Sequence, residues 1–177
     1  MHLRLDTYAS PLGETLLVTD NDGALRALDF ADYESRMHQL LANHYGDYEL
    51  KEGVTPRSVI HALDAYFDGE FTSLDDLRTA TGGTPFQRAV WKALRNIAPG
   101  TTKSYGQIAA EIGCPQANRA VGAANGANPI AIVVPCHRVI GANGTLTGYG
   151  GGLPRKQWLL DHERQRVGLP SQRLLEV

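Results

Sequence analysis

The sequence has few cysteines and no long apolar run. Two of its 177 residues are cysteines, Cys114 and Cys136, and they do not form a CxxC pair. Two isolated thiols support neither a disulfide framework nor a cysteine-rich zinc site, so we expect no bound metal and no cofactor. No stretch approaches the length of a membrane span and no apolar signal region opens the chain. We therefore expect a reduced, cytoplasmic setting without membrane contact.

An excess of positive charge and the common nucleotide-binding motifs are also lacking. The net charge is −2, which argues against a protein that is basic throughout. Residues 1–100 contain 9 basic residues (Lys and Arg) and 15 acidic residues (Asp and Glu), which gives a net charge of −6. Residues 101–177 contain 8 basic and 4 acidic residues, which gives a net charge of +4. A phosphate-facing surface is therefore expected in the second half. No GK[ST] occurs and no GxGxxG follows a strand, which argues against nucleotide-binding loops.

The pattern of apolar residues predicts two domains, over residues 1–80 and 81–177. Alternation over residues 2–6, 15–18 and 25–30 predicts an antiparallel three-stranded meander. Helical spacing follows Asp32, which we expect to act as an N-cap, and recurs over residues 56–67. Residues 46–56 are predicted as a loop with an extended segment near 48–50. Residues 68–83 are rich in Asp, Thr and Gly and are predicted to link the two domains.

Two Ser/Thr-x-x-Gln sequences in the second half fit capping boxes and predict helices from residues 85 and 105: Thr84 with Gln87, and Ser104 with Gln107. A further helix is predicted over residues 115–124, with Ala120, Val121 and Ala124 facing inward. Residues 105–124 thus resemble a helix-turn-helix, although many unrelated proteins contain such pairs. Arg119 would lie on the outer side of the second helix, as a DNA-facing side chain or as an ordinary solvated arginine.

The apolar run Ile132–Val134 is β-branched and predicts a buried strand. Pro135 would end this strand because it has no N–H to donate. Cys136 then stands beside His137 and Arg138, a base and a cation that favour the nucleophilic thiolate. The alternative is a buried cysteine that acts only as a small hydrophobe.

The remainder of the chain contains one polar residue that needs a partner. A hairpin sequence at residues 140–144 and a glycine-rich loop at 147–152 precede the last helix, which is predicted over 154–166. Tyr149 gives the loop an aromatic wall that could close over a small planar ligand. Glu163 lies on the apolar face of the helix, where a lone carboxylate is costly to bury. His162, on the neighbouring face with Trp158, is the competing candidate for the role of this residue.

Several segments match one known family. Pro135-Cys-His-Arg-Val139 is, letter for letter, the active-site signature of the O6-alkylguanine-DNA alkyltransferases, and the match continues at residues 104–107, 119–122, 128–129, 148–149 and 156–163. The resemblance is collinear from about Thr84 to Glu163, and it is greatest to the bacterial, constitutive stand-alone type. It implies an α+β protein. The N-terminal domain would be a ribonuclease-H-like antiparallel sheet with helices, and the C-terminal domain mainly helical with a helix-turn-helix.

The resemblance implies a role for five residues in catalysis. Cys136 would accept the alkyl group, His137 would relay the thiol proton through a water, and Glu163 would orient His137. Asn128 resembles the hinge residue that braces the active-site turn. Tyr105 resembles the hydroxyl donor that protonates the base nitrogen of the leaving guanine. The product is a thioether, for which the chain offers no release chemistry, so one protein would repair one lesion.

The resemblance also implies a partner, which is duplex DNA containing alkylated bases. O6-alkylguanine, with O4-alkylthymine as a second substrate, would be approached from the minor groove and flipped out of the stack. The protein would be a monomer in the absence of DNA. Arg119 resembles the finger that fills the vacated place. The implied DNA-binding residues are Arg119, Ser104, Gln116, Ala120 and Gly122, and the implied pocket residues are Val139, Tyr149, Gly150 and Lys156.

Two departures and two alternatives accompany this interpretation. Some relatives bind zinc through N-terminal cysteines and histidines, whereas both cysteines here lie downstream. Ala131 and Gly150 stand where some relatives carry proline and serine, which would widen the pocket.

A non-catalytic lesion-binding protein is the first alternative, although such proteins replace the cysteine. An unrelated thiol hydrolase that uses the same cysteine with His137 and Glu163 is the second. It would turn over, and it leaves Arg119 unexplained.

Overall fold

A computed structural model describes residues 1–172 and 175–176. These residues form two compact units. The first comprises Met1–Gly83 together with Pro129–Val133, and the second comprises Thr84–Asn128 and the chain from Val134 onward. The segment Pro129–Val133 therefore belongs to the first unit, although it lies in the second half of the sequence. No helix in the described ranges is both long and apolar enough to cross a membrane.

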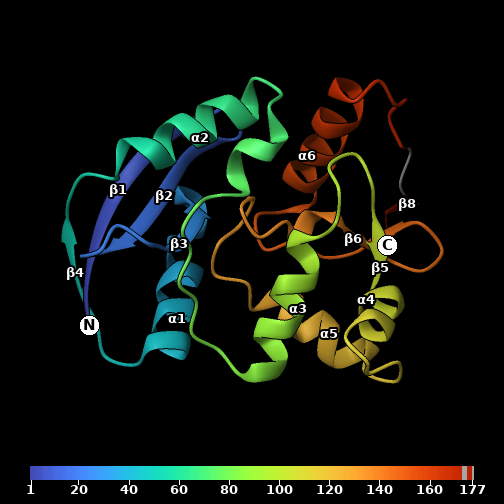
Figure 1. The fold of residues 1–177 in the computed structure, drawn as a ribbon, viewed down its shortest axis with the longest axis horizontal. Coiled ribbons are helices and arrows are strands. Elements are labelled where there is room, and N and C mark those ends of the chain that lie inside the picture. The colour runs from blue at the N-terminus through green and yellow to red at the C-terminus, as the bar shows by residue number, and fades with distance from the viewer. Residues whose placement is uncertain (173–174, 177) are drawn as a thin grey trace. The chain divides into compact units, whose positions relative to one another are not determined.

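The first unit is built on a four-stranded sheet (Figure 1). Its strands are β1 (His2–Ser10), β2 (Gly13–Asp20), β3 (Leu25–Phe30) and β4 (Glu49–Glu52), in the spatial order β3-β2-β1-β4. The predicted meander is present, because β1 pairs with β2 and β2 with β3 in antiparallel fashion. The extended segment predicted near residues 48–50 corresponds to β4, which pairs in parallel with β1, from His2 opposite Glu49 onward.

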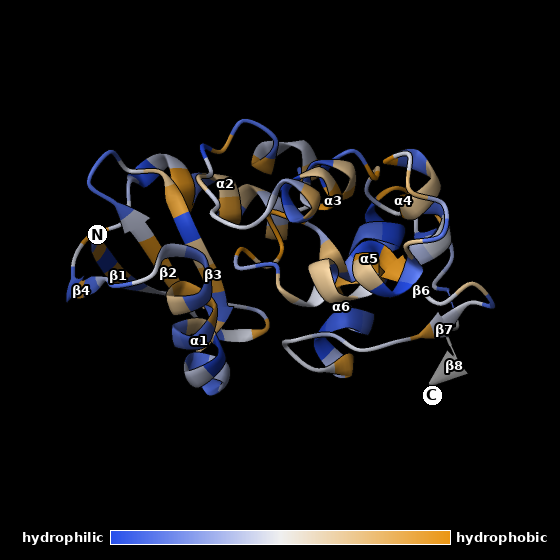
Figure 2. Cartoon of the chain, turned by 90° about the horizontal axis from the view of Figure 1, so that it is seen from below, coloured by the Kyte–Doolittle hydropathy of each residue, from blue (hydrophilic) through white to orange (hydrophobic). Residues whose placement is uncertain are grey.

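Helices cover both faces of this sheet. Helix α1 (Glu34–Tyr45) packs Met37 and Leu41 against one face, which contributes Leu3, Leu16 and Val18. Tyr8 points to the opposite face, because side chains alternate along a strand. There its hydroxyl donates to Asp64 of α2 (Arg57–Phe67) at 2.6 Å. Figure 2 shows the corresponding alternation of hydrophobic and hydrophilic residues along strands and helices.

Two local predictions in this unit are wrong. Asp32 does not cap α1, because it lies inside a 3-10 helix, η1 (Ala31–Tyr33), and the N-cap residue Tyr33 makes no side-chain cap bond. The predicted linker is also structured in part. Residues Phe71–Leu74 form the 3-10 helix η2, whose Phe71 and Leu74 are buried. Burial of these two side chains outweighs the turn-forming composition around them.

The second unit is mainly helical. Its helices are α3 (Pro85–Arg95), α4 (Tyr105–Glu111), α5 (Asn118–Gly126) and α6 (Leu153–Arg166). Strands β5 (Lys103–Ser104) and β6 (Val139–Ile140) pair in parallel, as do β7 (Thr145–Leu146) and β8 (Leu175–Glu176). Both predicted capping boxes are present: the side-chain oxygens of Thr84 and Ser104 each accept from the backbone N–H three residues on, at 3.1 Å.

The helix pair α4–α5 differs from prediction at its turn. Helix α5 begins at Asn118 instead of Pro115, because residues 114–117 form a turn closed by the Ala117 N–H on the Cys114 carbonyl at 2.9 Å. Val121 and Ala124 face inward as predicted, whereas Ala120 is exposed. The inward face of α5 is therefore the side that carries Val121 and Ala124, and Ala120 lies on the surface.

The predicted strand at Ile132–Val134 is absent. The three side chains are buried, as their composition indicates, but the backbone turns. Ala131 donates its N–H to the Leu28 carbonyl at 3.0 Å, and the Val133 N–H then returns to the Ala131 carbonyl at 2.8 Å. This bond closes a γ-turn over Ile132, whose φ of 69° is unusual for a β-branched residue. Local turns therefore satisfy buried backbone groups that a sheet ladder would otherwise satisfy.

Candidate active site

Cys136 begins a short 3-10 helix, η3 (Cys136–Arg138), that follows directly on the turn. Its N–H donates to the Val134 carbonyl at 2.8 Å across Pro135, and the Arg138 N–H donates to the Pro135 carbonyl at 3.0 Å. A 3-10 helix has three residues per turn, so consecutive side chains project in three different directions. The thiol, imidazole and guanidinium of this segment therefore cannot share one face.

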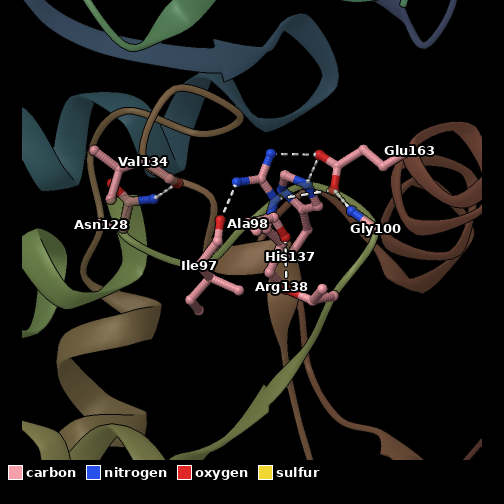
Figure 3. A network of polar contacts seen from close by, with 9 residues as sticks. Ile97, Ala98, Gly100, Asn128, Val134, His137, Arg138 and Glu163 are labelled. Carbon is pink, nitrogen blue, oxygen red and sulfur yellow. Dashed lines mark hydrogen bonds and ion pairs between the residues drawn. The ribbon is translucent and has the colours of Figure 1, made fainter. Parts of the chain in front are cut away.

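The His137 ring is held by a carboxylate from the last helix. Its Nε2 lies 2.7 Å from Oε1 of Glu163, and both residues are fully buried (Figure 3). Because an ionised carboxylate only accepts, Nε2 must carry the proton, which leaves Nδ1 with a lone pair. Within the described chain, Nδ1 is buried and has no hydrogen-bond partner. This arrangement presents a fixed, unoccupied basic nitrogen inside the protein.

Arg138 holds the same carboxylate from a second side. Its Nε donates to Oε2 of Glu163 at 2.9 Å and its Nη2 to Oε1 at 2.8 Å, while Nη1 donates to the Ile97 carbonyl at 2.6 Å (Figure 3). The Gly100 N–H adds a long contact of 3.5 Å to Oε2. From the sequence we expected this arginine to act as a cation beside the thiol. The structure instead engages its guanidinium in a fork on Glu163.

The electrostatics of this cluster favour an ionised glutamate and a neutral histidine. Burial alone raises the pKa of Glu163, but the charges and hydrogen bonds of His137 and Arg138 outweigh it and hold that pKa well below its usual range. Burial lowers the pKa of His137, and the nearby Glu163 opposes this shift without reversing it. His137 is thus neutral at pH 7 and able to accept a proton.

His162, the alternative to Glu163, serves a different contact. Its ring stacks on Trp158 with ring centroids 4.7 Å apart, and it is half-buried. Of the two, Glu163 is the residue that meets His137. No group of three or more His, Cys, Asp or Glu side chains in residues 1–172 is placed to hold a metal ion.

Asn128 braces the turn that precedes Cys136. The side chain is buried, and its Nδ2 donates to the Val134 carbonyl at 2.8 Å (Figure 3). The same carbonyl accepts the Cys136 N–H at 2.8 Å. One carbonyl oxygen therefore ties the end of α5 to the beginning of η3.

Lys156 and Tyr105 hold the glycine-rich loop at Thr147. The ammonium of Lys156 is fully buried and donates to the carbonyls of Val139 at 2.6 Å and Thr147 at 2.9 Å. Burial lowers the pKa of Lys156 to about 8, against a raising effect of Cys136. The Tyr105 hydroxyl lies 2.7 Å from the Thr147 hydroxyl. Val139 is buried, whereas Tyr149 and Gly150 are half-buried in this loop.

The predicted DNA-binding residues lie at the N-cap of α4, on α5 and in the turn between these helices. Gln116, Arg119 and Ala120 are exposed, and Ser104 and Gly122 are half-buried. Ser104 is also the N-cap of α4. A Cβ added at Gly122 would lie 3.9 Å from the Tyr105 ring, which is ordinary contact. The exposed members present one arginine among small or amide side chains.

The structure thus has a ribonuclease-like sheet unit, a helix-turn-helix unit and a buried cysteine–histidine–glutamate cluster. Residues 3–81 match the model described as 6-O-methylguanine DNA methyltransferase, ribonuclease-like domain, and residues 85–165 match the DNA-binding domain of the same family. The chain belongs to this family. The predicted resemblance and the predicted α+β class are confirmed.

Individual relatives cover nearly the whole chain. A methylated-DNA–protein-cysteine methyltransferase of Salmonella typhimurium is 54% identical over 165 residues, which is 92% of this chain and 96% of that protein. One from Methanosarcina acetivorans is 46% identical over 156 residues, covering 88% and 95%. The structure of Mycobacterium tuberculosis OGT in complex with DNA is similar, with a TM-score of 0.76 and 45% identity over 97% of this chain and 96% of that one.

Proposed function

We propose that this protein repairs alkylated DNA by transferring the alkyl group of O6-alkylguanine to the sulfur of Cys136, irreversibly and once per molecule. Its family and its relatives are methylated-DNA–protein-cysteine methyltransferases. The observation that carries the assignment to this residue is the orientation of His137. Its Nε2 is fixed by Glu163 and its Nδ1 lone pair is left unoccupied, one residue after the cysteine.

In the proposed reaction, His137 accepts the thiol proton through a water at Nδ1, and the thiolate attacks the alkyl carbon. The S–C bond forms, the C–O6 bond breaks, and the electron pair leaves on the guanine. Glu163 stays ionised and keeps the ring in the required tautomer, and Arg138 keeps Glu163 ionised. Tyr105 donates its hydroxyl proton to the base, after exchanging its contact with Thr147. A thioether is a poor leaving group, so the protein is consumed.

DNA is the proposed partner, bound by α4–α5 through its minor groove. The similar structure of Mycobacterium tuberculosis OGT in complex with DNA supports a DNA partner. The net charge of +4 over residues 101–177 supports contact with phosphates. Extruding a base costs a few kcal/mol. In our proposal Arg119, which is exposed on α5, offsets this cost by filling the stack. The DNA backbone would be contacted closely by Ser104, Gln116, Ala120 and Gly122.

The flipped base is proposed to lie between Val139, Tyr149, Gly150 and Lys156. The support is that Lys156 fixes the carbonyls of Val139 and of the loop residue Thr147. O4-alkylthymine is a second proposed substrate, as the family resemblance implies. We further propose a cytoplasmic monomer with functional domains over 1–80 and 81–177 that requires no metal or cofactor.

The transfer is tested by stoichiometry. A duplex containing one O6-[methyl-³H]methylguanine is incubated in excess with the protein, and label in protein and in solution is counted. We expect label in the protein to stop at one methyl group per molecule, with none released. A Cys136→Ser variant should take up none. Continued release of label into solution would support the thiol hydrolase instead, and binding without label transfer would support the lesion-binding protein.

A further inference from the structure

Thr147, at the start of the glycine-rich loop, has its N–H, its carbonyl and its hydroxyl in hydrogen bonds. The N–H donates to the Thr145 carbonyl at 3.0 Å, and the carbonyl accepts from the Lys156 ammonium at 2.9 Å. The hydroxyl lies 2.7 Å from the hydroxyl of Tyr105. Two backbone bonds therefore fix the position of a side chain that meets Tyr105, in a loop that is otherwise rich in permissive glycine.

A path of hydrogen bonds joins the segment of the reactive cysteine to Tyr105. Val139 directly follows η3, the short helix that begins at Cys136. The Lys156 ammonium donates to the carbonyl of Val139 at 2.6 Å and to that of Thr147 at 2.9 Å. The Thr147 hydroxyl completes the path to Tyr105. The proposed nucleophile and the proposed proton donor act on the same base, so a path of short bonds between them preserves the spacing that the reaction needs.

The ring of Tyr105 is positioned from its own helix, but its proton is not. Tyr105 is the first residue of α4, directly after the capping box that Ser104 and Gln107 form. A Cβ at Gly122 of α5 would lie 3.9 Å from its ring. These contacts place the phenolic oxygen, whereas the O–H bond can still rotate. A partner at the oxygen decides where the proton points, and Thr147 is that partner.

The direction of the bond between the two hydroxyls decides whether Tyr105 can act as an acid. Each hydroxyl has one proton to donate and can also accept. If Tyr105 donates to Thr147, its proton is already engaged. If Thr147 donates, the phenolic proton stays free for the base. In the proposed reaction Tyr105 therefore exchanges one contact for another with the same partner: it stops donating to Thr147 and accepts from it.

We propose that Thr147 is the positioning residue for Tyr105, a role that rests on the proposed function. Its hydroxyl donates to the phenolic oxygen while the proton of that oxygen passes to the leaving guanine. Negative charge then develops on the oxygen of Tyr105, so the bond from Thr147 becomes charge-assisted and stronger during the reaction. Thr147 keeps its own proton. The phenolate regains a proton from water and the imidazolium of His137 releases one, so the net change is the thiol proton exchanged for the alkyl group.

The experiment compares an alkyl donor whose leaving group must be protonated with one whose leaving group need not be. A duplex with one O6-methylguanine is the first donor. Methyl iodide is the second, because iodide leaves without a proton. The rate of methylation is followed by mass on the peptide that contains Cys136, since the exposed Cys114 also reacts with methyl iodide.

Three substitutions isolate the hydroxyl of Thr147. Thr147→Val removes it with little change of shape, and Thr147→Ser retains it. Thr145→Val is the matched control, because it removes a neighbouring hydroxyl that bonds to Asn143 instead of Tyr105. Tyr105→Phe, alone and combined with Thr147→Val, shows whether the effect of Thr147 passes through the phenolic oxygen.

We expect Thr147→Val to slow transfer from the duplex roughly ten- to hundredfold, the range for a hydrogen bond to a charged group. Its rate with methyl iodide should stay at the wild-type value. Thr147→Ser and Thr145→Val should match wild type with both donors. In Tyr105→Phe, which is already slow with the duplex, Thr147→Val should cause no further loss.

The inference is overturned if Thr147→Val keeps the wild-type rate with the duplex, or if it loses as much with methyl iodide. A full additional loss in the Tyr105→Phe background would also overturn it, because Thr147 would then act elsewhere. Failure of the proposed function has a different signature. Wild type would then be methylated at Cys136 by methyl iodide but take no methyl group from the duplex, and the role of Thr147 would fall with the function.

Discussion

Replacing Arg138 by methionine should disrupt the buried cluster more than any single surface change. The variant loses the two bonds to Glu163 and the bond to the Ile97 carbonyl. Methionine retains an apolar stem of similar length, so the packing loss is small. Removing one partner of a buried ion pair typically costs about 3–5 kcal/mol, because the other charge is left uncompensated. We expect a loss of that order in the free energy of unfolding from urea denaturation.

The same variant should change the state of His137. With Arg138 gone, the imidazolium of His137 becomes the cation that can compensate Glu163, so the pKa of His137 should rise. Nδ1 would then carry a proton and could no longer act as a base. We expect slower alkyl transfer at pH 7, with ¹⁵N NMR of the ring showing both nitrogens protonated. Arg138→Lys, which keeps the charge without the fork, should lie between wild type and Arg138→Met.

A double-mutant cycle with Glu163→Gln tests this reasoning. Each single variant leaves one buried charge uncompensated, whereas the double variant leaves neither. The double variant should therefore be more stable than the sum of the single effects predicts, by a coupling energy on the order of 3 kcal/mol. Additivity within about 0.5 kcal/mol would refute a direct Arg138–Glu163 interaction as the source of the cost.

Three further predictions address other parts of the protein. The folded-state pKa of Lys156 is about 8 and its ordinary value is 10.5, so the cost of burying its charge is present below pH 8 and disappears as pH rises to 10.5. Wild type should gain on the order of 3 kcal/mol of stability across this window relative to Lys156→Met, and parallel pH–stability curves would contradict this. Asn128→Ala removes the bond to the Val134 carbonyl and should cost about 1–3 kcal/mol in urea unfolding, with slower alkyl transfer; unaltered values in both assays would exclude the bracing role. Arg119→Ala should slow methyl transfer from duplex DNA, while alkyl transfer from free O6-benzylguanine and the unfolding midpoint stay unchanged. An equal loss of transfer rate with both donors would show that Arg119 does not act through DNA.

Short-range signals in the sequence predicted local structure well. Both capping boxes occur where Ser or Thr is followed three residues later by Gln, because the reciprocal bonds need only that spacing. The strand predicted at Ile132–Val134 is wrong for a related reason. Its β-branched composition reports burial, which is correct, but not the path of the backbone. That path depends on the Leu28 carbonyl, which is distant along the chain and accepts the Ala131 N–H. It also depends on the side chain of Asn128, which donates to the Val134 carbonyl.

The buried cluster was only partly predictable. The apolar face around Glu163 indicated that it needs a partner, and the family resemblance assigned His137 to it. The fork of Arg138 was missed, because it depends on the three-residue turn of η3, which sends consecutive side chains in different directions. The lack of a carboxylate for Lys156 was not visible either. Lysine in the first turn of a helix is usually exposed, and only the fold shows that its two acceptors are carbonyls.

The central claim is that Cys136 is the alkyl acceptor. Its most direct test is the mass of the protein after incubation with a duplex that carries one O6-methylguanine, followed by peptide mapping. The account predicts a gain of one methyl group on the peptide that contains Cys136, none on the peptide that contains Cys114, and no further gain with excess duplex. Methylation at Cys114, or an unchanged mass while the lesion disappears from the DNA, would contradict it.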